Sequence, residues 1–253
     1  QLLLAAYWYL IKESLLHFSL AQFYQSTTQI LTVGIPAAAT NLIQPLSTAF
    51  ATWLLSQFGT NVVAGFGVAS RIEAVAGMVV IGIGTSVVPL VGQNWGARQF
   101  KRVQQTLTTC YIACLSWGLI AAVIMWFGAG FFVSSISDNP DLMDSAVTFL
   151  HIIPLSIGFM GLITVANHAF NALRRPIPAL ILSVSRLVIV YVPLAFLGSY
   201  LYGYMGIFAA TAIANIVVGI FAIYWYQRVM RDAKSVLENP VNDSQGNPEL
   251  LKA

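Results

Sequence analysis

Three charged side chains lie inside long apolar stretches of this 253-residue chain: Arg71, Glu73 and Arg186. A charged group inside a membrane is costly, so it usually faces a partner or a wet cavity and often marks a transport pathway. Arg71 and Glu73 are two residues apart, which puts them on different faces of a helix, so each needs its own partner. A carboxyl at the depth of Glu73 keeps its proton until a cation or a base approaches. This pattern predicts an ion-coupled switch.

Structural roles fit the same three residues. Glu73 fits a structural hydrogen bond or ion pair. Arg71, in the outer half of its stretch, fits a side chain that extends outward to the membrane surface or meets a carbonyl group. Arg186 fits a partner for Glu73 or an anchor for an anionic ligand. The sequence leaves these alternatives open.

Uncharged polar residues mark one face of the first complete apolar stretch, at spacings of three, four and four: Asn41, Gln44, Thr48 and Thr52. Pro36 and Pro45 interrupt backbone hydrogen bonding in the same stretch. The pattern predicts a cavity wall with a hinge at Pro36 and Pro45. It also fits hydrogen bonds between helices, which Asn and Gln commonly form in membranes.

A second polar group falls in the fourth apolar stretch, where Asn167 and His168 are neighbours. Histidine changes charge near neutral pH, so His168 is a candidate proton carrier. A hydrogen-bonded packing role fits it equally well. Asn215, in the last stretch, is expected to bond a neighbouring helix.

The elements that must position these residues are membrane-spanning helices. The chain is 58% hydrophobic and only 8% charged, whereas soluble domains carry roughly 25% charged residues. Six apolar runs are long enough to cross a hydrocarbon layer of about 30 Å. The fold class predicted is an all-α polytopic membrane protein with six complete spans: 29–56, 62–91, 104–134, 144–170, 178–200 and 206–227.

Charge in the connections gives an orientation. Alternate connections hold the basic residues, among them Arg98, Arg174 and Arg175, and the others hold aspartates but no Lys or Arg. Positive charge marks the cytoplasmic side. We therefore expect a multi-pass protein of the cell (plasma or inner) membrane, with the lipid bilayer as a partner and both ends cytoplasmic.

The remaining segments complete the predicted organisation. Residues 1–11 are too short to cross and are expected to be the end of a truncated transmembrane helix. Residues 12–28 alternate polar and apolar groups at helical spacing and are predicted to form an amphipathic linker. Residues 29–230 hold the six-helix bundle, and the polar residues 231–253 are predicted to be a flexible cytoplasmic tail.

The sequence lacks the motifs that are typical of several functional classes. The chain contains no HExxH or GxSxG motif, no paired intramembrane aspartates and no phosphate-binding glycine loop with a lysine, so neither an enzyme nor a resident cofactor or metal is expected. The basic residues are confined to the connections on the predicted cytoplasmic side, as the membrane topology requires, so no nucleic-acid partner is expected. Cys110 and Cys114, the only cysteines, are predicted to pack as small apolar side chains.

Four stretches of sequence resemble a known family: GIPAAATNLIQPLS (34–47), FGVASRIE (66–73), VPLVGQNWGAR (88–98) and FNALRRPIPALILSVSRLVIVYVPLAFLG (170–198). They resemble the C-terminal half of MATE (multidrug and toxic compound extrusion) transporters. The resemblance covers roughly residues 25–230. It implies a twelve-helix protein of two six-helix lobes, with residues 12–28 as the inter-lobe linker and the N-terminal lobe as a partner.

The resemblance also implies alternating access, in which proton or sodium entry drives the export of small lipophilic, often cationic compounds. Some members bind cations through acidic residues on the first and fourth helices of this lobe. This chain has Asn41 and Gln44, and Asn167 and His168, in the corresponding spans. The departure puts a sodium site of that type in doubt. Other members couple protons through an aspartate of the N-terminal lobe. Glu73 falls within the matched RIE motif, and it remains one of the transport or coupling candidates, with Arg71, Arg186 and the four polar residues just named.

Three functions follow as hypotheses. The first is the C-terminal lobe of an H⁺- or Na⁺-coupled multidrug antiporter, with Phe50 and Trp53 as candidate drug contacts. The second is a flippase for lipids or anionic metabolites, which Arg71 and Arg186 facing a cavity would favour. The third is a membrane scaffold that transports nothing.

Overall fold

The structure is a computed structural model that describes residues 23–238. In this range every element of regular structure is a helix, and six helical stretches are long and apolar enough to cross a membrane. The predicted fold class, an all-α polytopic membrane protein, is confirmed. The chain divides into two compact units, residues 1–35 and 36–253. The contacts described below all lie within the second unit.

Each predicted span falls inside one of the six helical stretches, which are Phe23–Phe58, Thr60–Gly96, Phe100–Ser134, Pro140–Ala172, Pro176–Tyr202 and Tyr204–Arg228. The elements follow in chain order as α2 (Phe23–Leu55), η3 (Ser56–Phe58), α3 (Thr60–Gly96), α4 (Phe100–Ser134), α5 (Pro140–Ile152), η4 (Ile153–Ser156), α6 (Ile157–Ala172), α7 (Pro176–Val184), the π-helical η5 (Ser185–Tyr191), α8 (Val192–Tyr202) and α9 (Tyr204–Glu238).

Two predicted boundaries fall inside these helices. Helix α2 begins at Phe23, so the last residues of the predicted linker 12–28 continue into the first span. Helix α9 runs to Glu238, so the first residues of the predicted tail 231–253 are helical. Residues 1–11, the rest of the linker and residues 239–253 lie outside the described residues.

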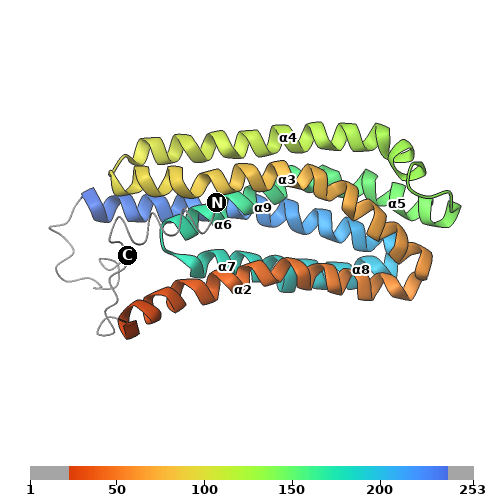
Figure 1. The fold of residues 1–253 in the computed structure, drawn as a ribbon, viewed down its shortest axis with the longest axis horizontal. Coiled ribbons are helices and arrows are strands. Elements are labelled where there is room, and N and C mark those ends of the chain that lie inside the picture. The colour runs from red at the N-terminus through yellow and green to blue at the C-terminus, as the bar shows by residue number, and fades with distance from the viewer. Residues whose placement is uncertain (1–22, 239–253) are drawn as a thin grey trace, which may run out of the picture. The chain divides into compact units, whose positions relative to one another are not determined.

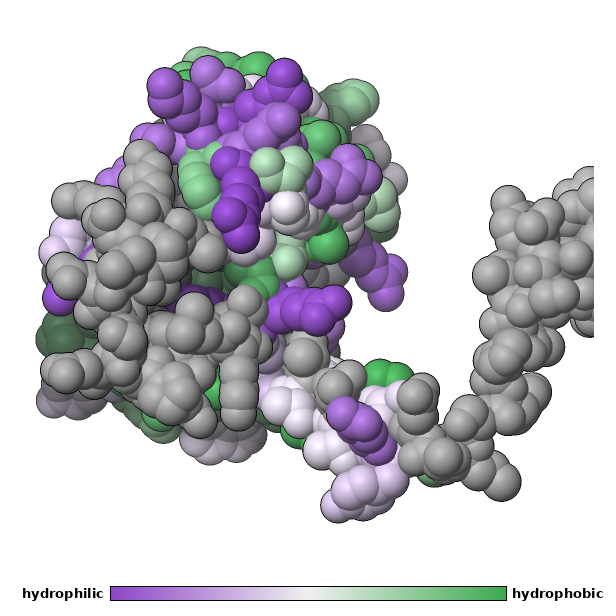
Figure 2. Space-filling model, turned by 90° about the vertical axis from the view of Figure 1, so that its left-hand side faces the viewer, coloured by the Kyte–Doolittle hydropathy of each residue, from purple (hydrophilic) through white to green (hydrophobic). Residues whose placement is uncertain are grey.

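The connections sort by charge between the two ends of the bundle. The α3–α4 and α6–α7 turns, which hold Arg98, Arg174 and Arg175, lie at the left-hand end in Figure 1. Figure 2 looks onto that end, and hydrophilic residues gather there. The α4–α5 connection, with Asp138, lies at the opposite end. The alternation that the sequence predicts is therefore present in the bundle.

The two basic turns share one backbone geometry. Arg98 and Arg174 adopt left-handed φ angles of 56° and 55°. In each turn, the N–H of the next residue reaches back to a carbonyl of the preceding helix, from Gln99 to Asn94 at 2.8 Å and from Arg175 to Phe170 at 2.9 Å. These bonds satisfy the last carbonyls of the helix and end it sharply. The GQNWGAR stretch therefore forms a tight C-terminus of α3.

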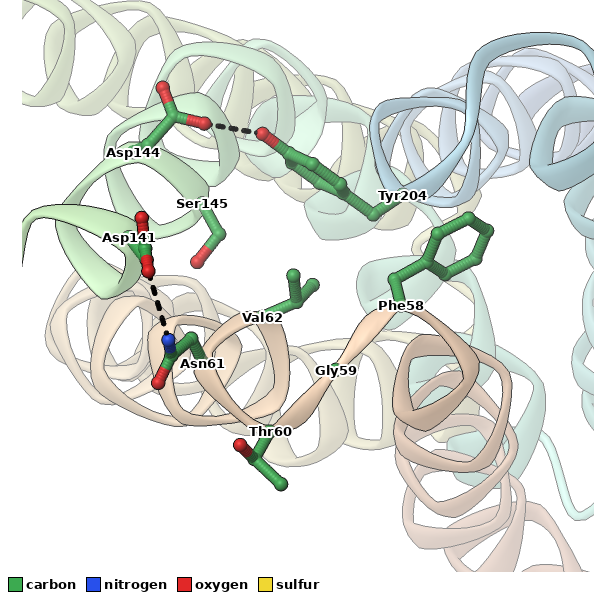
Figure 3. Close-up of a pocket in the computed structure, with 9 residues that line it drawn as sticks. All are labelled: Phe58, Gly59, Thr60, Asn61, Val62, Asp141, Asp144, Ser145 and Tyr204. Carbon is green, nitrogen blue, oxygen red and sulfur yellow. Dashed lines mark hydrogen bonds between the residues drawn. The ribbon is translucent and has the colours of Figure 1, made fainter.

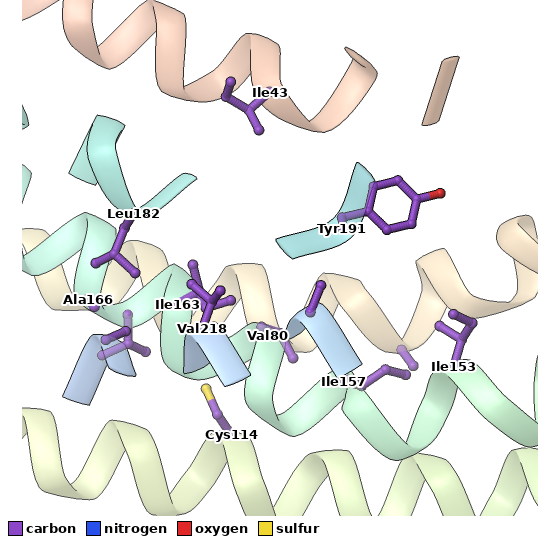
Figure 4. Packing of buried hydrophobic residues seen from close by; sticks show 14 of the residues in the cluster. Ile43, Val80, Cys114, Ile153, Ile157, Ile163, Ala166, Leu182, Tyr191 and Val218 are labelled. Atoms are coloured by element: carbon purple, nitrogen blue, oxygen red, sulfur yellow. The ribbon is translucent and has the colours of Figure 1, made fainter. Parts of the chain in front are cut away.

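The core forms where α3, α4 and α6 pack on one another, with α9 against α6 and α8. Figure 4 shows Val80, Cys114 and Ile163 of these three helices in one buried cluster. Small residues allow the closest approaches: a Cβ built on Gly118 of α4 would collide with the backbone of Gly158 of α6. Such contacts are the usual basis of helix packing in membranes. Cys110 and Cys114 are free thiols buried in this packing, as predicted.

Candidate functional site

Arg186 is the centre of a polar network that joins four elements of the bundle. Its Nη2 donates to Gln44 Oε1 on α2, and its Nη1 donates to Asn215 Oδ1 on α9, both at 3.0 Å. Asn215 in turn donates through Nδ2 to Ser156 Oγ, at 3.1 Å. Asn215 and Ser156 are buried, and Arg186 is half-buried. One guanidinium therefore connects α2, η5, α9 and η4.

The position of Arg186 follows from an interruption of its helix. Pro193 lies in the first turn of α8 and has no N–H, and its ring crowds the carbonyl four residues earlier, that of Ile189. The chain accommodates the proline with the wider π-helical turn Ser185–Tyr191, which holds Arg186. Such π segments relieve proline in membrane helices and are frequent at functional sites.

The helix containing Ser156 is interrupted in a similar way. Pro154 falls between α5 and α6, in the 3₁₀ turn Ile153–Ser156. Ser156 Oγ donates to the Ile153 carbonyl at 2.8 Å and accepts from Asn215. The network thus joins two broken helices. The contact of Asn215 with a neighbouring helix is the one expected from the sequence, whereas Ser156 was not predicted. Pro154, two residues before Ser156, was the available signal.

The polar face of α2 divides into two parts. Gln44 reaches across to Arg186, as expected for a hydrogen bond between helices. Thr48 and Thr52 instead donate to carbonyls of α2 itself, those of Gln44 and Thr48. Gln44, Thr48 and Thr52 also line a wide hollow on α2, together with Pro45, Ala49, Trp53 and Ser56. The predicted contact between helices is therefore present at Gln44, and the predicted cavity wall corresponds to an open hollow lined by α2 and Ser56 alone.

The remaining predicted features of α2 lie nearby. Asn41 is exposed. Helix α2 continues through Pro36 and Pro45, and because Pro45 has no N–H, the Asn41 carbonyl lacks its usual donor. Phe50 packs edge-on against Tyr191 and Phe196, with ring centroids 5.8 and 5.6 Å apart. Helix α2 thus meets the interrupted helix at Gln44 and again, further along, at Phe50.

Asn167 and His168 lie on α6 and have different surroundings. Asn167 Nδ2 donates to Ser183 Oγ of α7 at 3.0 Å, while its Oδ1 is buried without a partner. His168 Nδ1 lies 2.8 Å from the Thr164 carbonyl one turn earlier. The His168 ring also borders Gly84 of α3, where a Cβ would come within 3.3 Å of Nδ1. His168 is thus a hydrogen-bonded, half-buried residue of the α3–α6 contact.

Arg71 and Glu73 do not join the Arg186 network. Arg71 is exposed and Glu73 is half-buried on α3. Within residues 23–238, neither side chain has a hydrogen bond or an ion pair. Arg186 bonds two neutral amides, so pairing with Glu73, one of the two alternatives given for it, is wrong in this structure.

A separate pocket lies where the connections at the non-basic end meet (Figure 3). Tyr204 donates through its hydroxyl to Asp144 Oδ2 at 2.6 Å, and Asn61 Nδ2 donates to Asp141 Oδ2 at 3.2 Å. Both aspartates belong to α5, while Asn61 belongs to α3 and Tyr204 to α9. These bonds fasten three helix starts to one another. Among residues 23–238, no cluster of three His, Cys, Asp or Glu side chains could hold a metal ion.

Comparisons with known proteins agree with this architecture. The family model MatE matches residues 36–197. An FAD transporter of Shewanella oneidensis is 30% identical over 239 residues, which is 92% of this chain and 52% of the relative. The probable multidrug resistance protein YpnP of Bacillus subtilis is 25% identical over 201 residues, 79% of this chain and 45% of the relative.

A solved structure gives the same result in three dimensions. The crystal structure of the Vibrio cholerae MATE transporter VcmN in the bent form superimposes with a TM-score of 0.78 and is 30% identical, covering 83% of this chain and 48% of that one. The chain spans about half the length of these relatives. On the match of sequence and fold together, the chain belongs to the MatE family of membrane transporters.

Proposed function

We propose that this chain forms the C-terminal lobe of a twelve-helix exporter that moves small organic compounds across the cell membrane by alternating access. The observation that carries the proposal is the hollow on α2, lined by Gln44, Thr48 and Thr52 within a helix long enough to span a membrane. Polar groups at that depth are retained where they line a water-accessible path. The N-terminal lobe, as the partner across that path, is part of the proposal.

The orientation rests on charge. The basic turns between α3 and α4 and between α6 and α7 share one end of the bundle, which we assign to the cytoplasm. Both ends of the chain are then cytoplasmic. Pro36 and Pro45 weaken backbone bonding in α2, so we assign the bending of the cavity wall to this helix.

The substrates proposed first are lipophilic, often cationic compounds, with entry of H⁺ or Na⁺ as the driving reaction. The name of the Bacillus subtilis relative, a probable multidrug resistance protein, supports this class. Trp53, exposed and lining the hollow, offers a ring for such compounds. Glu73 is the proposed coupling group, because it is an intramembrane carboxyl with no bonded partner among the described residues.

The test uses the full-length protein in proteoliposomes. Export of a cationic dye is measured while a pH or sodium gradient is imposed, and Glu73→Gln is expected to lower gradient-driven export at least tenfold. Asp138→Asn, which changes an exposed acid in the α4–α5 connection, is the matched control and should leave export unchanged. Undiminished gradient-driven export by Glu73→Gln would remove Glu73 from the coupling role.

A second candidate substrate class is anionic, as for a flippase or an exporter of anionic metabolites. The specific observation in its favour is Arg186, an intramembrane guanidinium held by neutral amides alone. The FAD transporter of Shewanella oneidensis, a relative by sequence, supports the same class. Wild-type protein that moves neither a cationic nor an anionic solute would favour the scaffold hypothesis instead.

A further inference from the structure

We propose that Arg186 binds the oxyanion of an exported aromatic solute, with the solute's ring lying against Trp53. The inference rests on the proposed transport function and names one substrate class for the same cavity. The solutes concerned carry a phosphate or carboxylate group joined to a planar ring by a flexible linker.

The positive charge of Arg186 has no counter-charge among its partners. Arg186 keeps its positive charge, and its two side-chain partners, Gln44 and Asn215, carry none. Within residues 23–238 no carboxylate forms an ion pair with it. A charge placed inside a membrane is retained when it has a counter-charge or a functional role. The described lobe supplies no counter-charge, which leaves the guanidinium available to an anion from outside the lobe.

The guanidinium of Arg186 also has unused donors. A guanidinium has five N–H groups in a planar fork that suits carboxylate and phosphate oxygens. Two of the five are used by Gln44 and Asn215. Bonds from an arginine to an anionic oxygen are roughly twice as strong as bonds between neutral groups. An oxyanion can therefore add to the free donors or replace the Gln44 amide.

A second polar side chain lies in the same π-helical segment as Arg186. Tyr191 is only 4% exposed, and its hydroxyl is buried without a hydrogen-bond partner. Tyr191 follows Arg186 by five residues in the same π-helical segment, where residues five apart lie on one face. A buried unpartnered hydroxyl is costly. Tyr191 is therefore a further buried polar group on the face of the π-helical segment that carries Arg186.

The hollow on α2 places the aromatic part of the solute. Gln44 and Trp53 both line the hollow on α2, and Trp53 is 53% exposed. They are nine residues apart, a distance of about 14 Å along a helix. Phe196 of α8 packs on Trp53 with ring centroids 6.3 Å apart and leaves part of the indole free for a planar ring. The hollow thus has at one end Gln44, whose Oε1 lies 3.0 Å from Nη2 of Arg186, and at the other end the indole ring of Trp53.

The test compares FAD, which carries phosphates, with riboflavin, which has the same ring system and none. Binding of each to the purified full-length protein is measured by equilibrium dialysis. Arg186→Gln is expected to weaken FAD binding at least tenfold and to change riboflavin binding less than twofold, whereas Arg186→Lys keeps part of the FAD affinity. Arg71→Gln removes the other intramembrane arginine and is the matched control, with both affinities unchanged.

The other outcomes are equally informative. Equal losses for both flavins would show a structural role for Arg186 and overturn the inference. Unchanged FAD binding by Arg186→Gln, or wild-type protein that binds no FAD, would overturn it as well. Dye export by the same wild-type preparation tests the proposed function separately, so the two failures are distinguishable. Thermal unfolding of each variant identifies a protein that has not folded.

Discussion

Two sets of intramembrane charges in this lobe have opposite surroundings. Arg186 is bonded to side chains from two other helices, and its network extends to a buried serine. Arg71 and Glu73, on α3, have no side-chain partner among residues 23–238. All three interrupt apolar sequence in the same way, so the local sequence alone does not separate them.

The difference follows from the helices that carry them. Arg186 lies in a π-helical turn and is linked, through Asn215, to the 3₁₀ turn that contains Pro154. Irregular turns change the direction of side chains and allow them to converge. Helix α3 is continuous from Thr60 to Gly96, so Arg71 and Glu73 keep ordinary helical directions and diverge. Breaks in helices, more than charges themselves, mark where a polar network can form.

The strongest test of this comparison is Asn215→Leu. Asn215 is 3% exposed and accepts from Arg186, so the substitution removes a buried hydrogen bond to a charged group. We expect a loss of about 2 kcal/mol of stability. Thermal unfolding of the full-length protein in detergent, followed by tryptophan fluorescence, measures it. Asn41→Leu, at an exposed position of α2, is the control and should unfold as the wild type does.

The large features of the fold could be predicted because they follow from bulk physics. Lengths of apolar runs and the charges between them are enough to place six spans, and each predicted span lies inside an observed helical stretch. The polar face of α2 was also predictable, since residues three and four apart share a helix face. The spacing predicts the helix face on which Gln44 lies, but it does not predict that Arg186 is its partner.

The partners themselves depend on contacts between distant segments. Gln44 and Arg186 are 142 residues apart, and Ser156 and Asn215 are 59 apart. No periodicity within one helix encodes such a pair. The buried hydroxyl of Tyr191 gave no sequence signal either, because a tyrosine in an apolar span usually packs or lies at an interface. Which polar residues pair with one another is determined by how the helices pack around their interruptions.

A smaller effect is expected for Gln44→Leu. Its bond to Arg186 lies at an exposed site, where water replaces much of what is lost, so the cost is about 1 kcal/mol or less. The informative measurement is hydrogen exchange by residues 36–55, which should rise while exchange in α4 stays the same. Unchanged exchange in α2 would mean that the Phe50 ring contacts alone hold this helix against η5 and α8.

The smallest effect is expected for Arg71→Gln. Arg71 is exposed and has no bonded side-chain partner among the described residues, so its loss should change stability by less than about 0.5 kcal/mol. The measurement is again thermal unfolding, beside Asn215→Leu in the same detergent. A loss as large as that of Asn215→Leu would mean that Arg71 is held by a group beyond the described lobe. Arg71 and Arg186 would then both have partners, and they would differ only in that the partners of Arg186 lie within the described lobe and the partner of Arg71 lies outside it.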